Sequence, residues 1–415
     1  MVYLRYLIMA NKPRIRFRGF TEDWEQCKLG DLYKRVNERN DGTLGRDKWI
    51  SVAKMYFQDP DKVQSNNLDT RTYVMKKGDI AFEGHPNNEF KFGRFVLNDI
   101  GTGIISELFP IYRPITEYDL DFWKYAIQLE RVMAPIFAKS ITSSGNSSNK
   151  LDHNHFLNQE LLVPNIEEQK KIGTLLSLLS KNITLHQHKL KKLNLAKKAL
   201  LQKLFPRNGS QFPVVRFKGF TDAWEQRKLD DIVKIKTGGG TPKTTNPEYW
   251  SGDIPWIQSS DLVEGDIVHV NINKYINDRA LKNSAAKLIS RDSIALVTRV
   301  GVGKVAVINQ DFTTSQDFLS LSNFDGNDIK FFAYQLYRLM QENAKILQGT
   351  SIKGITKTDL IEQSIVIPSS IQEQNLIANV LSKIDSIITL HQRKLKITRS
   401  KKRLASKNVC IELQG

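Results

Sequence analysis

The feature that most constrains the fold is an internal repeat. Residues 13–35 read PRIRFRGFTEDWEQCKLGDLYKR and residues 213–235 read PVVRFKGFTDAWEQRKLDDIVKI, at an offset of 200 residues. A second pair of segments, residues 167–190 and 372–395, matches at an offset of 205. Paired opening and closing segments indicate a tandem duplication. We therefore expect two similar halves, which also suits a length of 415 residues that is too great for one core.

The two halves differ between their matched ends. Residues 37–160 and 237–363 have similar lengths but share little recognisable sequence. We call the matched opening and closing segments of each half its frame, and the residues between them its insert. The two frames are similar, and the two inserts differ. We expect an α/β (α+β) chain in which two globular domains form a tandem pseudo-twofold repeat.

The closing segments predict two long helices that pair as a coiled coil, because their apolar residues follow a 4-3 spacing. Pro164 and Pro368 precede the predicted helix starts, where acidic residues suit the helix dipole. His186 and His391 recur at equivalent positions and predict matched packing or a hydrogen bond between the helices, with a metal ligand as the alternative. The predicted seam comprises Ile172, Leu176, Leu179, Ile183 and His186 in the first helix, and Ile377, Leu381, Ile384, Ile388 and His391 in the second.

Charge predicts how the helices pair. The net charge is +1 over residues 167–185 and +6 over 186–204, against −1 over 371–390 and +8 over 391–409. Parallel pairing would set the two strongly basic blocks side by side, so we expect antiparallel helices. About 38 residues at about 1.5 Å each predict a spacer of about 57 Å. The two inserts would then lie at opposite ends, related by rotation, as suits a bipartite target on duplex DNA.

Composition narrows the class of partner. A net charge of +17 favours an anionic polymer such as double-stranded DNA. The two cysteines, Cys27 and Cys410, lack metal-ligand spacing, which argues against a disulfide framework and against secretion. The apolar start is far shorter than the roughly 20 residues of a membrane helix. We expect a cytoplasmic protein without a membrane anchor, with residues 1–8 as a tail and Met9 as an alternative start.

In the second insert, polar residues gather at predicted loops. The stretch from Lys236 holds a glycine-rich loop whose backbone could approach phosphates closely, although a simple turn between strands is the alternative. Residues 293–309 predict a hairpin with two basic residues at its tip, for which plain solvation is the alternative. The candidate DNA-binding residues of this insert are Gly239, Thr241, Pro242, Lys243, Ser259, Arg299, Lys304, Ser351 and Lys353.

The first insert offers parallel features by position. KWISVAKM from Lys48 is the counterpart of IPWI at 254–257, and residues 78–97 predict a second hairpin. Asparagine can pair with adenine, and lysine or arginine with guanine. His153 and His155 are expected at a strand edge without a special role. The candidate DNA-binding residues of this insert are Lys48, Lys54, His85, Asn87, Asn88, Lys91, Ser144 and Asn146.

Each insert also predicts a helix that is followed by a polar loop. Helices from Asp119 and Asp328 space their apolar residues as a buried face. The loops at 140–150 and 347–355 are rich in hydroxyls, amides and lysines that suit base or phosphate contacts. A flexible linker is the alternative for the serine-rich loop at 140–150.

Catalytic motifs are weak. Asn246–Tyr249 reads NPEY where adenine methyltransferases have Asn-Pro-Pro-Tyr, and no glycine-rich cofactor motif follows a strand. Pro60-Asp61 with Glu89-Phe90-Lys91 fits the permissive pattern of metal-dependent nucleases. Residues 301–304 lack the glycine spacing of a phosphate-binding Walker loop. We therefore expect no catalytic residues, no resident metal and no cofactor in this chain.

With these residues in view, the chain resembles the specificity subunit of type I restriction-modification enzymes over nearly all of residues 13–409. The carriers are the doubled opening motif, GGTP at 239–242, IPW at 254–256, and the EEQ and QEQ helix starts. The resemblance implies two inverted target recognition domains, each reading half of a split site. It further implies that the conserved helices act as a ruler and as a docking surface for two methyltransferase subunits. Restriction subunits would join them, so that S-adenosylmethionine, ATP and Mg²⁺ belong to partner subunits.

Two other hypotheses stay open: a self-contained nuclease or methyltransferase, and an assembly scaffold without sequence preference. The basic helix ends would either track DNA phosphates or meet an acidic partner. Changing Lys197, Lys198, Lys401 and Lys402 to Gln would distinguish these roles through the salt dependence of DNA binding. The predicted boundaries are a tail at 1–12, recognition domains at 13–163 and 213–367, spacer helices at 164–206 and 368–409, a linker at 207–212 and a tail at 410–415.

Overall fold

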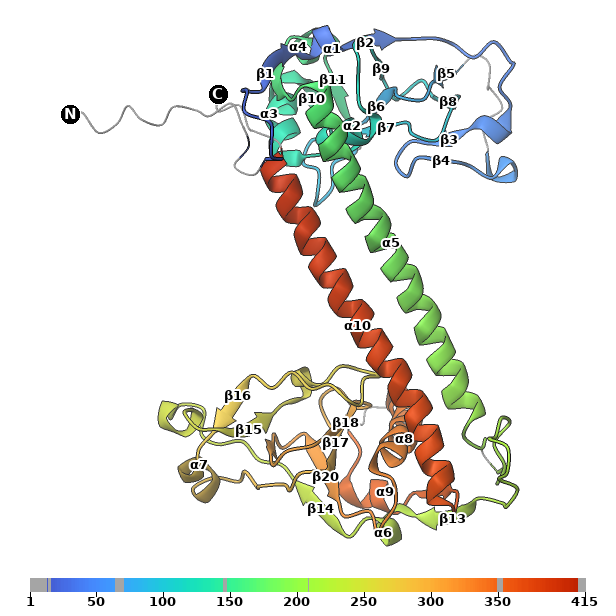
Figure 1. The fold of residues 1–415 in the computed structure, drawn as a ribbon, viewed down its shortest axis with the longest axis vertical. Helices are drawn as coiled ribbons and strands as arrows, with labels where there is room; N and C mark the ends of the chain where they lie inside the picture. The colour runs from blue at the N-terminus through green and yellow to red at the C-terminus, as the bar shows by residue number, and fades with distance from the viewer. Residues whose placement is uncertain are drawn as a thin grey trace, which may run out of the picture. The chain divides into compact units, whose positions relative to one another are not determined.

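Two compact units divide the chain: unit 1 comprises residues 1–185 and 395–415, and unit 2 comprises residues 186–394. Both units contain small sheets, and two long helices, α5 (Ile166–Lys203) and α10 (Ile371–Val409), contribute residues to both (Figure 1). The prediction of a mixed fold with two sheet-containing domains and two long helices is confirmed. The structure is a computed structural model that describes residues 13, 16–63, 71–144, 148–207, 209–348 and 354–409. The predicted tails at 1–12 and 410–415 lie outside these ranges.

The opening and closing segments of unit 1 pack against each other. Strand β1 (Glu25–Lys28) pairs antiparallel with β12 (Glu160–Val163), which directly precedes α5. Arg16 donates two hydrogen bonds, at 2.8 and 2.7 Å, to the buried carboxylate of Glu168 in the first turn of α5. Trp24 Nε1 donates a third at 3.1 Å. The two motifs recur together along the chain because they form a single contact.

Unit 2 builds the same frame. Strand β13 (Glu225–Lys228) pairs antiparallel with β21 (Ser364–Ile367), which directly precedes α10. Arg216 donates to the buried Glu373 carboxylate at 2.7 and 2.9 Å. Each frame therefore contains a buried ion pair whose two members come from the repeated motifs.

A glutamine beside each buried glutamate joins the long helix to the insert. Gln169 accepts from the Asp119 N–H at 3.3 Å, and Gln374 accepts from the Asp328 N–H at 3.0 Å. Each glutamine also donates, at 3.0 Å, to the carbonyl of the proline before its helix. The EEQ and QEQ sequences thus fix where the insert's own helix begins.

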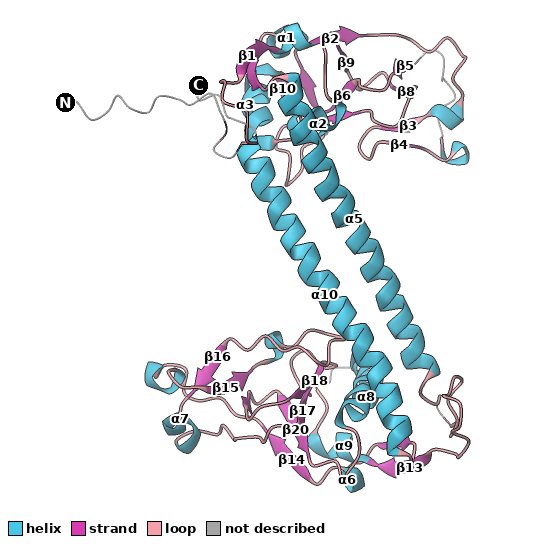
Figure 2. Ribbon diagram, viewed as in Figure 1, coloured by secondary structure: helices cyan, strands magenta, loops and turns pink. Residues whose placement is uncertain are grey.

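The two inserts share a sheet topology that their sequences do not reveal. All neighbouring strands in these two four-stranded sheets are antiparallel, and the predicted hairpins occupy corresponding places in them (Figure 2). A common order of strands means that the duplication extends through the inserts. The order is β2 (Tyr33–Val36), β9 (Ile111–Pro114), β6 (Ile80–Glu83), β7 (Arg94–Leu97) in unit 1, and β14 (Ile235–Gly238), β20 (Phe318–Ser322), β17 (Ser293–Val297), β18 (Val305–Ile308) in unit 2.

Short strands and helices complete each insert. Strands of unit 1 are β3 (Ile50–Ser51), β4 (Tyr56–Phe57), β5 (Thr72–Met75), β8 (Gly103–Ser106), β10 (Ile141–Ser144) and β11 (Asn149–Leu151), and its helices include α1 (Leu29–Leu32), η1 (Arg46–Lys48), η2 (Pro60–Lys62) and α4 (His153–Leu157). Unit 2 contains β15 (Ile254–Ile257), β16 (Lys274–Ile276), β19 (Thr313–Thr314), α6 (Leu229–Ile232), η3 (Pro247–Trp250), η4 (Ser259–Asp261), α7 (Asp278–Lys282) and α9 (Lys357–Ile361). The expected strand edge at His153 and His155 is wrong: both residues lie in α4, which Asp152 caps by accepting from the His155 N–H at 2.8 Å.

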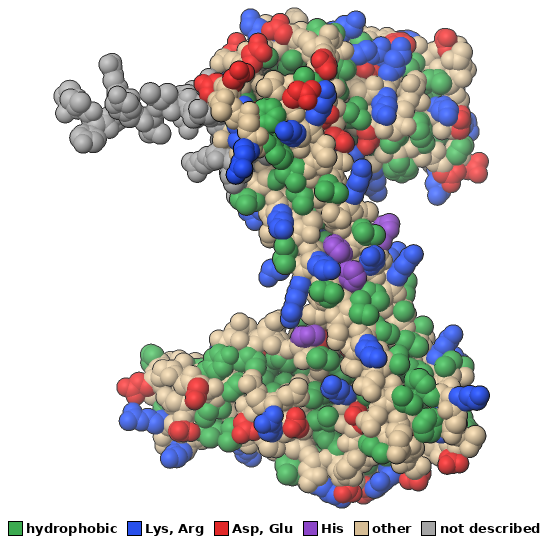
Figure 3. Space-filling view, in the orientation of Figure 1, with side chains coloured by type: hydrophobic (Ala, Val, Ile, Leu, Met, Phe, Trp, Pro, Cys, Tyr) green, Lys and Arg blue, Asp and Glu red, His purple; other side chains and the backbone are tan. Residues whose placement is uncertain are grey.

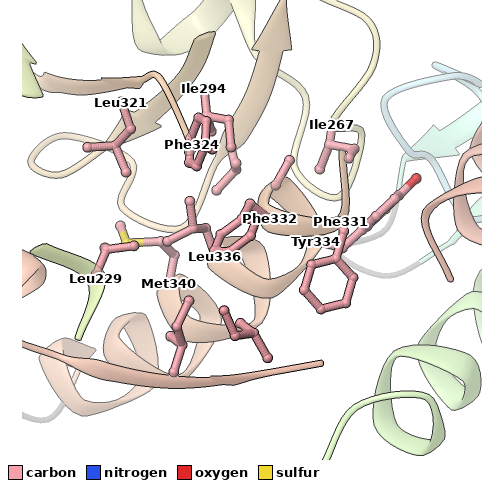
Figure 4. Packing of buried hydrophobic residues seen from close by; sticks show 14 of the residues in the cluster. Leu229, Ile267, Ile294, Leu321, Phe324, Phe331, Phe332, Tyr334, Leu336 and Met340 are labelled. Atoms are coloured by element: carbon pink, nitrogen blue, oxygen red, sulfur yellow. The ribbon is translucent and has the colours of Figure 1, made fainter. Parts of the chain in front are cut away.

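A helix beside each sheet supplies much of the core. In unit 2 the predicted helix is α8 (Ile329–Gln348), whose Phe332 and Leu336 pack among aliphatic side chains of the sheet (Figure 4). In unit 1 the predicted single helix is wrong, because it divides into α2 (Leu120–Ala126) and α3 (Glu130–Ser140). Leu129 interrupts it with an extended backbone while packing against the core.

Within unit 2 the long helices run antiparallel. His186 of α5 lies 3.0 Å from His391 of α10, measured between the Nδ1 atoms. Lys197, later in α5, pairs with Asp385, earlier in α10. Rising numbers on one helix thus meet falling numbers on the other, which confirms the predicted orientation in this unit. The histidines make the predicted contact between the helices.

The predicted seam also serves the domain cores. Ile172 and Leu176 are buried in the core of unit 1, and Ile377 and Leu381 are buried in that of unit 2. The first turns of each long helix therefore cover its own globular domain. Further along, Leu179, Ile183 and Ile384 are half-buried and Ile388 is buried. None of the helices in the described ranges combines the length and apolar character that a membrane crossing would need.

Candidate nucleic-acid interface

Loops from distant parts of unit 2 meet beside the tip of the β17–β18 hairpin. The Thr298 N–H donates to the Asp317 carbonyl at 2.8 Å, and the Thr298 carbonyl accepts from the Ile355 N–H at 2.8 Å. The Ser315 N–H donates to the Ile257 carbonyl at 2.9 Å, which joins the loop before β20 to the end of β15. The hairpin tip, the end of β15, the loop before β20 and the segment after α8 therefore form one cluster.

The glycine-rich loop belongs to this cluster, and two of its glycines lie where a Cβ would not fit. A Cβ on Gly239 would lie 2.0 Å from the Ser315 carbonyl oxygen, and one on Gly240 would lie 2.1 Å from that of Ala285. Trp256 Nε1 donates to the Gly240 carbonyl at 3.0 Å. The glycines are needed because the backbone approaches the chain itself. Packing therefore accounts for these two glycines, and a phosphate contact at this loop stays a prediction.

The other residues predicted in this loop differ in exposure. Pro242 is buried, whereas Thr241 is half-buried and Lys243 is exposed. The Thr241 hydroxyl hydrogen-bonds to the side-chain oxygen of Gln316, which is exposed. Sequence reasoning missed Gln316, because the contact joins residues 75 positions apart and leaves no local pattern.

The two basic residues predicted at the hairpin tip have different surroundings. Lys304 is half-buried, and its ammonium donates to the Ser259 carbonyl at 2.7 Å. It therefore ties the hairpin to η4. Arg299 is exposed at the tip, where its side chain can reach a ligand. Ser351 and Lys353 lie outside the described residues.

In unit 1, hydrogen bonds from other segments of the chain likewise hold the tip of the β6–β7 hairpin. The Asn149 N–H donates to the Gly84 carbonyl at 2.8 Å, and Asn149 Nδ2 donates to the Phe92 carbonyl at 3.0 Å. The Lys91 N–H donates to Glu130 of α3 at 2.9 Å. The loop between β6 and β7 is thus held against the β10–β11 hairpin and against α3.

This rigid loop exposes several of the residues predicted to bind DNA. Asn87 is exposed, but its side-chain oxygen accepts from the N–H groups of Glu89 and Phe90 at 2.9 and 3.0 Å, so it shapes the loop. Of the other residues predicted to bind DNA in this loop, His85, Asn88 and Lys91 all have exposed side chains.

Three of the remaining predicted residues of unit 1, namely Lys48, Lys54 and Ser144, lie on other described segments of the insert. Lys54 is exposed beside Ala53, whose carbonyl accepts from Arg94 of β7 at 2.7 Å. Lys48 ends η1 and is exposed, with its ammonium 5.5 Å from the centre of the Phe57 ring. Ser144 belongs to β10, and Asn146 lies outside the described residues.

The basic halves of the long helices hold two kinds of lysine. Lys197 is buried against Asp385, and Lys402 is half-buried with its ammonium 4.7 Å from the centre of the Tyr125 ring. Lys198 and Lys401 are exposed. Figure 3 shows Lys and Arg side chains gathered along the visible face of these helices. Only the exposed lysines of the four predicted can meet DNA or an acidic partner without disturbing the fold.

The weak catalytic motifs find structural explanations. Asn246 caps η3 by accepting from the Glu248 N–H at 3.1 Å. Asp61 lies in the first turn of η2, capped by Asp59, whereas Glu89 lies in the loop between β6 and β7. In the part of the chain that the structure describes, no three His, Cys, Asp or Glu side chains gather where they could hold a metal ion.

Comparison with known proteins points to one family. Residues 221–399 match the family described as type I restriction modification DNA specificity domain. The chain is 34% identical over 172 residues to the type I restriction enzyme MjaIX specificity subunit of Methanocaldococcus jannaschii, a match that covers 40% of this chain and 38% of that relative. It is 23% identical to the putative type I restriction enzyme MjaX specificity subunit of the same organism, with 97% of each chain covered.

A solved structure shows the same fold. The crystal structure of the S subunit of a type I restriction-modification system from M. genitalium superposes with a TM-score of 0.64 at 13% sequence identity, covering 97% of this chain and 100% of that one. The likeness therefore extends through both units and both long helices.

Proposed function

Because this chain belongs to the specificity subunits of type I restriction-modification systems, which are non-catalytic, we propose that it reads a bipartite DNA target with one half-site per unit. Unit 1 and unit 2 would each apply their clustered loops to one half-site. The long helices would set the spacing and dock two methyltransferase subunits, and restriction subunits would join that core in the cytoplasm. S-adenosylmethionine, ATP and Mg²⁺ would be used by those partners.

One observation carries this proposal: in both units the segment that follows the core helix is hydrogen-bonded to the start of the hairpin tip, at Gly84 in unit 1 and at Thr298 in unit 2, but the two tips present different side chains. Unit 1 exposes His85, Asn88 and Lys91 at its tip, whereas unit 2 exposes Arg299 at its tip and Gln316 in the loop that is hydrogen-bonded to it. Sequence is read by hydrogen bonds to base edges, so different side chains on one scaffold would read different half-sites.

The long helices support the spacing role. His186 and His391 are equivalent residues at the offset of 205, and they contact each other. Equivalent residues meet in this way when a twofold axis passes between two antiparallel helices. Two recognition domains related by such an axis would approach the two strands of a duplex in the same manner.

Methylation profiling tests the proposal. The full chain is expressed with the methyltransferase subunit of its own system, and the methylated positions of the host DNA are sequenced. We expect one motif with two specified segments at a constant separation. Replacing the insert 237–363 with that of another specificity subunit should change one segment and leave the other. A single continuous motif, or methylation without sequence preference, would contradict the proposal, and the second result would favour a scaffold.

The enzyme alternative has its own test. The purified chain alone is incubated with DNA and either Mg²⁺ or S-adenosylmethionine. We expect neither cleavage nor methyl transfer. Either activity, surviving in the absence of partner subunits, would identify a self-contained nuclease or methyltransferase.

A further inference from the structure

The exposed side chain of Gln316 occupies a rigid position in the loop cluster of unit 2. The residue before it, Ser315, donates its N–H to the carbonyl of Ile257 in β15 at 2.9 Å, and the carbonyl of the residue after it, Asp317, accepts from the N–H of Thr298, which directly follows β17, at 2.8 Å. The backbone on one side is thus tied to the three-stranded sheet that contains β15, and the backbone on the other side to the end of a strand in the four-stranded sheet. Gln316 itself is exposed. Its side chain therefore extends into solvent from a backbone that hydrogen bonds hold in place.

A hydrogen bond also orients the amide of this side chain. Gln316 Oε1 is bonded to the Thr241 hydroxyl, and since an amide oxygen only accepts, the hydroxyl is the donor. The carboxamide therefore turns its oxygen toward Thr241 and leaves one oxygen lone pair and both N–H groups for a ligand. Holding a side chain in its bound orientation lowers the entropy lost on binding.

An oriented carboxamide fits one DNA base edge. In the major groove adenine presents N7 as an acceptor and N6 as a donor, and a glutamine amide meets both at once. We propose that Gln316, positioned by Thr241, reads an adenine in the half-site recognised by unit 2. This inference rests on the proposed function of the chain and assigns one base contact within it.

The test uses the full chain in complex with its methyltransferase subunit. Once the wild-type motif is known, a set of duplexes is made in which each base pair of both half-sites is replaced in turn, and the relative affinity for each duplex is measured. Gln316→Ala should lose discrimination at one A·T pair of one half-site, where a bidentate contact is worth about 5- to 150-fold. Every other position should keep its wild-type preference.

Two further variants test the chemistry of the contact. Gln316→Glu keeps the size of the side chain but only accepts hydrogen bonds, so preference at that position should move toward cytosine, whose N4 is a donor. Thr241→Val removes the orienting hydroxyl and should weaken the same preference without moving it. Gln310→Ala is the matched control, because Gln310 is an exposed glutamine at the other end of β18 and should leave every preference unchanged.

The outcomes separate this inference from the proposed function. If the wild-type complex shows no bipartite motif, the proposed function fails and the inference fails with it. If the motif is present but Gln316→Ala keeps the wild-type preference at every position, only the inference is overturned. An equal loss of affinity for all duplexes would also overturn it, because a base contact acts at one position.

Discussion

In each unit a lysine of a long helix lies over a tyrosine ring of the insert: Lys197 over Tyr334 in unit 2, and Lys402 over Tyr125 in unit 1. The two units differ in the residue that faces the charge of the lysine. In unit 2, Lys197 pairs with Asp385, and Tyr334 donates to the same carboxylate at 2.7 Å. At the offset of 205 the counterpart of Lys197 is Lys402, and the counterpart of Asp385 is Ser180. The lysine thus has the same position in both units, but the position of its acid is occupied by aspartate in unit 2 and by serine in unit 1.

Burial acts on these groups in opposite directions. Burial raises the pKa of the Asp385 carboxyl, although Lys197 and Tyr334 favour its charged form. Burial lowers the pKa of the Lys402 ammonium, and the nearby Lys124 adds to this effect. A basic residue on a long helix can thus be a structural part of its unit, so net charge alone does not mark a DNA-binding surface.

The largest expected effect comes from breaking the pair in unit 2. Asp385→Ala leaves Lys197 buried without its acid, which should destabilise unit 2 by about 3 to 5 kcal/mol. Urea unfolding of the full chain, with hydrogen exchange to identify the unit that opens, measures this. Ser180→Ala is the control at the equivalent position of unit 1, where we expect a change of less than about 1 kcal/mol. Equal effects of the two substitutions would contradict the comparison.

A second comparison concerns the tryptophan of the repeated opening motif. Trp24 donates to Glu168 at 3.1 Å, whereas Trp224 Nε1 is buried without a partner among the described residues. Trp24→Phe should therefore cost more than Trp224→Phe, by about 1.5 to 3 kcal/mol for a hydrogen bond to a charged group. Thermal unfolding of the two variants would decide this, and a larger cost for Trp224→Phe would show that the frames are held differently.

The exposed lysines of the long helices should act on DNA affinity. Lys198→Gln and Lys401→Gln should each lower the slope of log affinity against log salt by about 1 if the lysine touches a phosphate. Lys189→Gln, at another exposed position of α5, compares a lysine near the middle of the helix. Slopes that stay at the wild-type value for both Lys198→Gln and Lys401→Gln would assign these lysines to a protein partner.

The smallest expected effect comes from giving unit 1 the missing acid. Ser180→Asp should stabilise unit 1 by about 0.5 to 1 kcal/mol, by supplying Lys402 with a carboxylate partner like the one that Lys197 has.

The stability of wild-type unit 1 should depend on pH through Lys402. The pKa of Lys402 in the folded chain lies below its ordinary value of 10.5, so at a pH between these two values the unfolded chain binds more protons than the folded chain. Stability of wild-type unit 1 should therefore rise with pH across that window.

Measurement of unfolding free energy against pH checks this pH dependence. In the Ser180→Asp variant the pKa of Lys402 should return toward its ordinary value, so the rise should shrink. An unchanged slope would show that the introduced carboxylate does not reach Lys402, and that the two units differ in geometry as well as in sequence.

The periodic and repeated parts of the molecule could be predicted well. The 4-3 spacing predicted α5 and α10, because an apolar stripe of that period is buried only by a helix. The two hairpins and α8 were also predicted from local patterns. The division of the other core helix at Leu129 was not, because it depends on how that side chain packs against the core of unit 1.

The exposure of the candidate site's side chains was predicted less well than the fold. Arg299, Asn88 and Lys243 were expected to face a ligand, and they are exposed. Pro242 is buried, and Lys304 bonds to the Ser259 carbonyl. Residue type alone could not separate these cases, since whether a side chain at a turn faces solvent depends on which other loops lie beside it.

The duplication, the two long helices and their antiparallel pairing follow from the amino-acid sequence, because repeated motifs must fold alike and like-charged blocks repel. Three features emerge only from the folded chain: which loops meet at each hairpin tip, the approach of Gly239 and Gly240 to their own chain, and the orientation of Gln316 by Thr241. Those contacts join residues far apart in the chain, and their formation depends on the packing of a whole unit, which no local spacing of residue types records.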